Sequence, residues 1–244
     1  MSEDRDLNIR VICGLLASVA RFVPVPFLDD ILRERALALM VSQTLSARGR
    51  TFGSGAVAPL YSDSRGCMEG CLVFVLLLPI RLLLFPFRKV LVWVMGVKYL
   101  ATDLSEAVLL GRALDTALGA GRLPEGAEKG ARLAEATLIR KAFESAVAGA
   151  DMKLLQTSMR AALGSVKGLP RAALAALRRL RRGGNDDVGD PIAGLAGKER
   201  KAVDEGTGKV RAALASPDVA AMLEGFDARF QQNLVVLSER AGRR

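Results

Sequence analysis

The chain has 244 residues, with 35 lysines and arginines against 26 aspartates and glutamates, and it contains no histidine. This length allows one or two domains with a substantial buried core, without disulfide or metal scaffolds. The lack of histidine excludes Ser-His-Asp and Cys-His catalysis, HExxH zinc sites and imidazole pH switches. Half of the residues are hydrophobic, and the chain after residue 100 is rich in Ala, Leu, Arg and Glu. This composition predicts an all-α, multi-helix bundle.

The N-terminal part predicts two helices. Residues 7–22 have an amphipathic pattern that ends at the prolines of segment 23–26. The pattern fits a helix packed on the protein's own core and equally a helix lying in a bilayer interface. A second helix is expected to continue through about Ala47, with Asp29 or Asp30 as its N-cap.

The start of this second helix carries a family resemblance. Pro24-Val25-Pro26-Phe27-Leu28-Asp29, followed by Met40 eleven residues after the aspartate, resembles a motif of a family of bacterial helical domains. Those domains occur in inner-membrane proteins of unknown function and fused to small GTPases. A glutamine of that motif is absent here, where Ala36 to Ala38 stand in its neighbourhood. The resemblance covers fewer than 20 of the 244 residues and implies membrane association.

Three cysteines, Cys13, Cys67 and Cys71, are too few for a four-cysteine zinc site and are odd in number, which favours a reducing compartment. Cys67 and Cys71 lie one helical turn apart beside an apolar run, so palmitoylation is the alternative to inert thiols. The mixed charge of the first ten residues lacks the basic start of a secretory signal.

No nucleotide-binding or catalytic motif is recognised. Residues 48–69 are rich in glycine and serine and predict a loop or linker. The sequence at 206–209 fails the P-loop pattern, because Val203 and Val210 replace its first glycine and its Ser or Thr. Adjacent carboxylates lie where helix capping or solvation accounts for them. These pairs are Asp29/Asp30, Asp186/Asp187 and Asp204/Glu205. We therefore expect no catalytic residue, metal or cofactor, and no enzyme.

The strongest signal is the apolar segment 70–97. Residues 70–87 contain one charge, Arg81, and thirteen Leu, Ile, Val or Phe side chains. Those side chains favour membrane insertion by about 4 to 8 kcal/mol, against about 2.5 to 3.5 kcal/mol for a central arginine. The net balance predicts a membrane-associating segment, with Pro79 and Pro86 reducing the gain.

This segment allows a tilted span, a kinked re-entrant segment or an in-plane helix. Basic residues on both flanks suit the re-entrant form, and the spacing of Arg81, Arg88 and Lys89 places them on one face of an in-plane helix. The alternative is a buried helix of a soluble bundle, in which Arg81 needs a carboxylate partner. We expect the membrane contacts to involve Leu72, Phe74, Leu77, Arg81, Leu84, Phe87 and Trp93.

The remainder of the chain predicts further helices. One starts at Thr102-Asp103, because Asp103 and Glu106 have capping-box spacing, and it stops at Gly119 to Gly121. Others are expected at about 127–148, 152–163, 171–182, 198–214 and 218–239. The helix from 127 is expected to turn Ala131, Leu138, Ala142 and Phe143 toward a core. The last helix has an apolar stripe that indicates core packing: Val219, Met222, Phe226, Phe230, Leu234 and Leu237.

Basic charge is concentrated in residues 152–182, which contain eight basic residues and no acidic one. We expect a surface for anionic lipid or another polyanion there, formed by Arg171, Arg178, Arg179, Arg181 and Arg182. Nucleic acid is the less favoured ligand, since these residues lack aromatic stacking partners. A solvated charged face explains the same pattern.

These observations divide the chain into amphipathic helices (1–47), a loop (48–69), the apolar segment (70–100), a helical domain with a basic end (103–182), a linker (183–197) and a helical hairpin (198–244). They predict a non-enzymatic scaffold or adaptor at a membrane, with its C-terminal helices facing the cytoplasm. Its expected partners are anionic lipid head groups and an unidentified protein or a second copy of the chain. The alternatives are a soluble adaptor or nucleic-acid-binding module, and a lipid-handling protein with a tunnel lined by Val73, Leu77 and Leu84.

Overall fold

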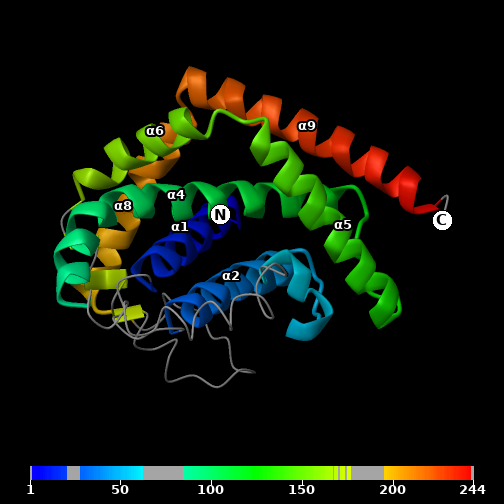
Figure 1. Cartoon of the computed structure of the whole chain (residues 1–244), viewed down its shortest axis with the longest axis horizontal. Coiled ribbons are helices and arrows are strands. Elements are labelled where there is room, and N and C mark those ends of the chain that lie inside the picture. Colours follow the sequence, from blue (N-terminus) through cyan, green and yellow to red (C-terminus); the bar gives the residue numbers. More distant parts are fainter. Residues whose placement is uncertain are drawn as a thin grey trace.

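The computed structural model describes residues 2–20, 28–62, 85–166, 168–169, 171–173, 175–176 and 195–242. Over these ranges the chain is an all-α bundle without strands (Figure 1). The α-helices are α1 (Ser2–Ala20), α2 (Leu28–Ala47), α4 (Phe85–Gly119), α5 (Lys129–Ala148), α6 (Met152–Gly164), α8 (Gly197–Leu214) and α9 (Pro217–Gly242). Two short 3-10 helices, η1 (Ser54–Ala56) and η2 (Ala58–Leu60), interrupt the predicted loop. The all-α bundle predicted from composition is confirmed.

Helix α1 is a core helix. Nearly every side chain described between residues 9 and 18 is buried, and the helix packs against α2, α4 and α8. Gly14 allows α1 to lie directly on α4, because a Cβ there would be 2.9 Å from the Leu104 Cα. Of the two placements that the amphipathic pattern allowed, the structure therefore has α1 in the protein's own core. Cys13 is buried in this helix, whereas Cys67 and Cys71 lie outside the described residues.

Helix α4 forms the axis of the bundle and runs through the middle of the view in Figure 1. The predicted helix start at Thr102-Asp103 is wrong, since α4 begins at Phe85 and passes through these residues without a break. The predicted stop is confirmed, because α4 ends at Gly119. There the Gly121 and Arg122 amides bond to the Leu118 and Ala117 carbonyls, with Gly121 in the left-handed region that glycine adopts readily.

Helices α5 and α9 pack side by side on one flank of α4. Their contact contains an aromatic cluster, in which the Phe226 ring centroid is 6.2 Å from Phe143 and 6.4 Å from Phe230. Val219, Phe226, Phe230 and Leu234 are buried, while Met222 and Leu237 are partly buried against them, so the predicted stripe is confirmed. On α5, Ala142 and Phe143 are buried and Leu138 is partly buried, but Ala131 is exposed. Its predicted core position is wrong because it lies in the exposed first turn of the helix.

Helices α6 and α8 pack together on the other flank and close the core. The predicted helix 152–163 is confirmed as α6, and Asp151 caps it by accepting a hydrogen bond from the Leu154 amide at 3.0 Å. One hydrophobic cluster connects Ile9 on α1 with Leu234 on α9. The N-terminal helices therefore share one core with α8 and α9, which pack on α6 and α5 respectively instead of forming a close hairpin with each other.

Candidate functional site

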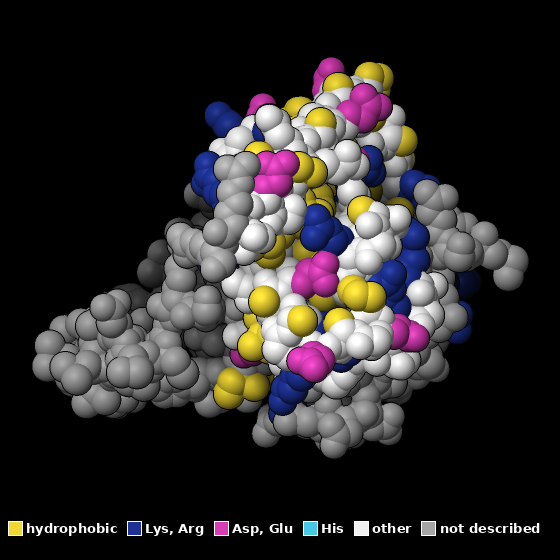
Figure 2. Space-filling view, turned by 90° about the vertical axis from the view of Figure 1, so that its right-hand side faces the viewer, with side chains coloured by type: hydrophobic (Ala, Val, Ile, Leu, Met, Phe, Trp, Pro, Cys, Tyr) yellow, Lys and Arg dark blue, Asp and Glu magenta, His cyan; other side chains and the backbone are white. Residues whose placement is uncertain are grey.

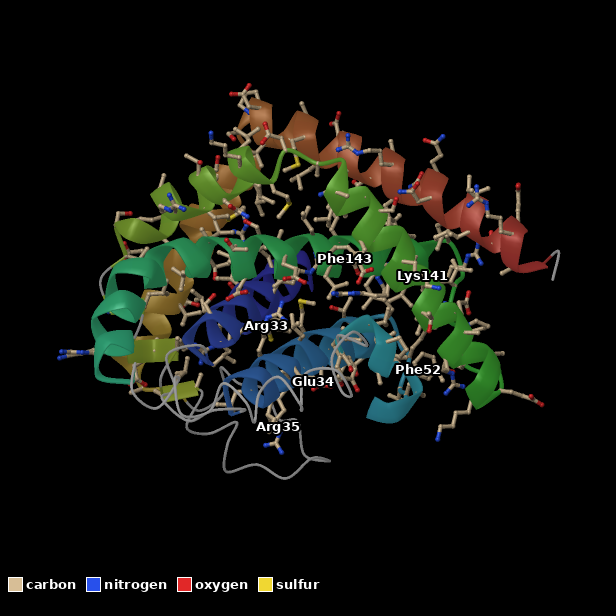
Figure 3. The ribbon with its side chains drawn as sticks, viewed as in Figure 1. Arg33, Glu34, Arg35, Phe52, Lys141 and Phe143 are labelled. Atoms are coloured by element: carbon tan, nitrogen blue, oxygen red, sulfur yellow. The ribbon has the colours of Figure 1, made fainter. Side chains whose placement is uncertain are left out.

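Three carboxylates on the second half of α4 face arginines of neighbouring elements. The buried Asp103 carboxylate lies 3.7 Å from the Arg33 Nε, and the Arg33 Nη2 donates to Glu106 at 2.8 Å. The second Glu106 oxygen lies 3.7 Å from Arg140 on α5. Figure 3 shows Arg33 on the side of α2 that faces α4. These residues tie α2, α4 and α5 together, and we call them the Arg33–Glu106–Arg140 network.

Arg140 extends this network. Its Nε donates to Glu144 one turn along α5 at 3.0 Å, and its Nη1 donates to the Leu60 carbonyl of η2 at 3.3 Å. Next to η2, burial raises the pKa of the Tyr61 phenol, and the negative charge of Glu34 raises it further. The network therefore also holds the segment that follows α2.

A second set of ion pairs lies further along α4. Asp115 accepts a hydrogen bond from Arg10 of α1 and lies 3.4 Å from Arg48 at the end of α2. On the opposite flank, Arg112 donates to both carboxylate oxygens of Asp227 on α9 at 2.8 to 2.9 Å. Bidentate arginine–carboxylate pairs fix direction as well as distance. Together with the Arg33–Glu106–Arg140 network, these ion pairs connect the second half of α4 to four other helices: α1, α2, α5 and α9.

The loop after α4 is held from both sides. The Leu123 amide donates to Glu135 of α5 at 3.0 Å, and Arg50 donates to the carbonyls of Arg122 and Leu123. Leu123 has a φ of 53°, an unfavourable region for leucine, and its side chain is completely buried. The buried side chain and these hydrogen bonds offset the local backbone strain.

These carboxylates and arginines connect helices. Over the ranges that the structure covers, no group of three or more Cys, Asp and Glu side chains is placed to hold a metal ion. Asp204 and Glu205 are exposed on α8, where Glu205 pairs with Lys209 at 2.8 Å. The ion pairs of the Arg33–Glu106–Arg140 network hold α4 in position.

The predicted membrane-contact residues are only partly described. Phe87 and Trp93 lie on the first half of α4. The remaining five lie outside the described residues: Leu72, Phe74, Leu77, Arg81 and Leu84. Among the helices of the described ranges, none combines the length and the apolar character needed to cross a bilayer.

The predicted basic surface is also described in part. Arg171 is exposed beside the buried Ala172, Ala173 and Ala176, so this short stretch turns its alanines to the core and its arginine to solvent. The other four arginines lie outside the described residues: Arg178, Arg179, Arg181 and Arg182.

Sequence reasoning did not identify the residues that hold α4. Their spacing predicts a capping pair at Asp103 and Glu106, although both lie inside a continuous helix. Their role in ion pairs could have been inferred from their position on an otherwise apolar helix face. A carboxylate that is buried on such a face requires a basic partner. That position predicts a partner without naming Arg33, which lies 73 residues from Glu106.

The fold and the ion pairs define an all-α bundle assembled around one long, firmly held helix. Comparison of this chain with protein-family models, with curated proteins and with solved structures finds no match.

Proposed function

We propose that this protein is a non-enzymatic scaffold or adaptor that associates with the cytoplasmic face of a membrane. Residues 70–100 provide the attachment, and the remaining helices present a surface to a protein partner or to a second copy of the chain. The membrane association implied by the resemblance of residues 24–40 agrees with this proposal.

The observation that carries the proposal is the continuity of α4. Its first half, from Phe85 to Leu100, continues the apolar sequence that begins at Gly70, and its second half enters the bundle at the buried Ala101. The 35 residues of α4 form one helix whose first turns bend away from the remainder, as the left side of Figure 1 shows. The apolar sequence is therefore joined to the bundle by a helix instead of a flexible linker.

The ion pairs support the same proposal. Asp103, Glu106, Arg112 and Asp115 all lie on the second half of α4 and connect it to α1, α2, α5 and α9. Because the second half of α4 is held in this way, the first half of the helix keeps a fixed position relative to the bundle. Arg88, Lys89 and Lys98 on the first half supply positive charge, which favours anionic membrane surfaces at about 1 kcal/mol per residue.

Fractionation of the full-length protein tests the proposal. We expect the protein to sediment with membranes, to remain there after alkaline extraction and to be released by detergent. Arg81→Leu removes an insertion cost of about 2.5 to 3.5 kcal/mol and should increase retention. Arg160→Leu changes an exposed α6 residue in the same chemical way and serves as the matched control.

Two results would contradict the proposed membrane association. A protein that stays in the supernatant without detergent contradicts membrane association. Unchanged retention of Arg81→Leu together with lower thermal stability indicates a buried helix, in which the loss of Arg81 leaves a carboxylate unpaired at about 3 to 5 kcal/mol.

A further inference from the structure

A pocket of about 230 Å³ lies where the end of α2 meets the loop that leads to η1. It is lined by Ser42, Leu45, Ser46, Arg50, Thr51, Phe52 and Gly53. Figure 3 shows Phe52 close to α5, and the Arg132 guanidinium lies 4.1 Å from the centre of its ring. The space-filling view of this end of the molecule shows Lys and Arg side chains gathered along one side (Figure 2).

The pocket is rich in hydrogen-bond donors that the protein itself does not use. The hydroxyls of Ser42, Ser46 and Thr51 have no hydrogen-bond partner in the described part of the chain. The same holds for the backbone amides of Thr51, Phe52 and Gly53. Consecutive backbone amides together with hydroxyls are a common donor set for oxyanions.

Arg50 adds a positive charge that is already oriented. Its Nη1 donates to the carbonyls of Arg122 and Leu123, which fixes the guanidinium at the wall of the pocket. A guanidinium held in place loses little freedom when it binds an anion. No Asp or Glu lines the pocket.

The end of α2 does not oppose an anion as strongly as an open helix end would. Its last carbonyls are occupied, since Leu45 O accepts from the amides of Arg48 and Arg50, and Ser46 O accepts from Gly49. Gly49 has a φ of 70°, the left-handed conformation that this hydrogen-bond pattern requires. The negative end of the helix dipole is therefore partly neutralised before a ligand arrives.

We propose that this pocket binds a small oxyanion of the phosphate-monoester class. The phosphoryl oxygens accept hydrogen bonds from Arg50, Thr51 and the serine hydroxyls, and the organic group lies against Phe52. The pocket adjoins the loop after Gly119, at the opposite end of α4 from Phe85. On the basis of the proposed function, in which the Phe85 end faces the membrane, the source is a soluble phosphate monoester and not a lipid head group.

Calorimetric titration of the detergent-solubilised full-length protein with inorganic phosphate and with phenyl phosphate tests the pocket. We expect saturable binding of both, with phenyl phosphate tighter because its ring contacts Phe52. Thr51→Val should weaken binding about tenfold, since it removes one hydrogen bond to a charged group. Thr157→Val removes an exposed hydroxyl on α6 and should leave binding unchanged.

Arg50→Gln should abolish binding, but this change also breaks the contacts to the loop after α4. The exposed Thr51 and Ser46 therefore provide the independent variants, because their side chains bond to no other residue described. Absence of saturable binding, or equal weakening by Thr51→Val and Thr157→Val, overturns the proposal. Binding to phosphatidic acid vesicles without binding to either soluble probe overturns the soluble source. None of these results depends on whether the protein sediments with membranes.

Discussion

Gly14 sets the spacing between α1 and α4, and its replacement by alanine gives the sharpest test of the packing. The added Cβ would lie 2.9 Å from both the Cα and the Cδ1 of Leu104 and 3.2 Å from the Cβ of Ala107. Ordinary carbon–carbon contacts are about 3.5 to 4.0 Å. Because the Leu104 Cα belongs to the buried α4 backbone, side-chain rotation cannot relieve the contact, and the two helices must separate by about 0.6 to 1 Å.

The magnitude follows from two opposing effects. Overpacking a well-packed core costs about 1 to 3 kcal/mol. Replacing glycine by alanine inside a helix raises the free energy of unfolding by about 1 kcal/mol. We therefore expect Gly14→Ala to lower the free energy of unfolding by up to about 2 kcal/mol, which lowers the melting temperature by up to about 8 °C in a chain of this size.

Gly208→Ala is the matched control, because this glycine lies inside α8 and a Cβ there would meet nothing within 4 Å. The control should raise stability by about 0.5 to 1 kcal/mol. Urea denaturation and thermal melting of both variants measure the difference. If Gly14→Ala stabilises the protein as much as Gly208→Ala does, the close approach of α1 to α4 is refuted.

Three other results are expected. Arg33→Met should lower the free energy of unfolding by about 2 to 4 kcal/mol, and the double variant with Asp103→Leu should recover part of this loss. If urea denaturation shows that the two losses are additive, the Arg33–Asp103 ion pair is contradicted. Because its folded pKa is raised, Tyr61 contributes stability that is complete below pH 10 and is lost as the pH rises through the folded value, so Tyr61→Phe should flatten the fall in melting temperature above pH 10. Phe226→Ala should cost about 3 to 5 kcal/mol by leaving a cavity, whereas Val235→Ala at an exposed position should change stability by less than about 0.5 kcal/mol in the same assay.

Several helices were predictable from local signals. Glycine after the last helical turn and a capping residue before the first act within a few residues, so the C-terminal ends of α2 and α4 and both ends of α6 agree with the sequence. The α9 stripe was predictable for the same reason, since seven turns of 3.6-residue periodicity define one buried face. The predicted N-cap of α2 is wrong, since Asp29 and Asp30 lie inside the helix, which begins at Leu28.

The start of α4 was not predictable in this way. Asp103 and Glu106 have the spacing of a cap, but three-residue spacing also places two side chains on one face of a continuous helix. Whether Asp103 and Glu106 form a cap or lie inside a helix depends on whether Arg33 and Arg140 face them. These arginines belong to α2 and α5. Packing between segments that are distant in the sequence therefore determines where α4 begins.

Local sequence patterns are sufficient to predict the helical class, most helix ends and the apolar segment from which the membrane proposal starts. The burial of α1, the continuity of α4 and the pocket at residues 42–53 are visible only in the folded chain. Periodicity indicates that a helix face is buried, but it does not show what covers that face. The residues that line the pocket are local in the sequence, but the Arg50 side chain is held there by the loop after α4, through contacts between residues 72 to 73 positions apart.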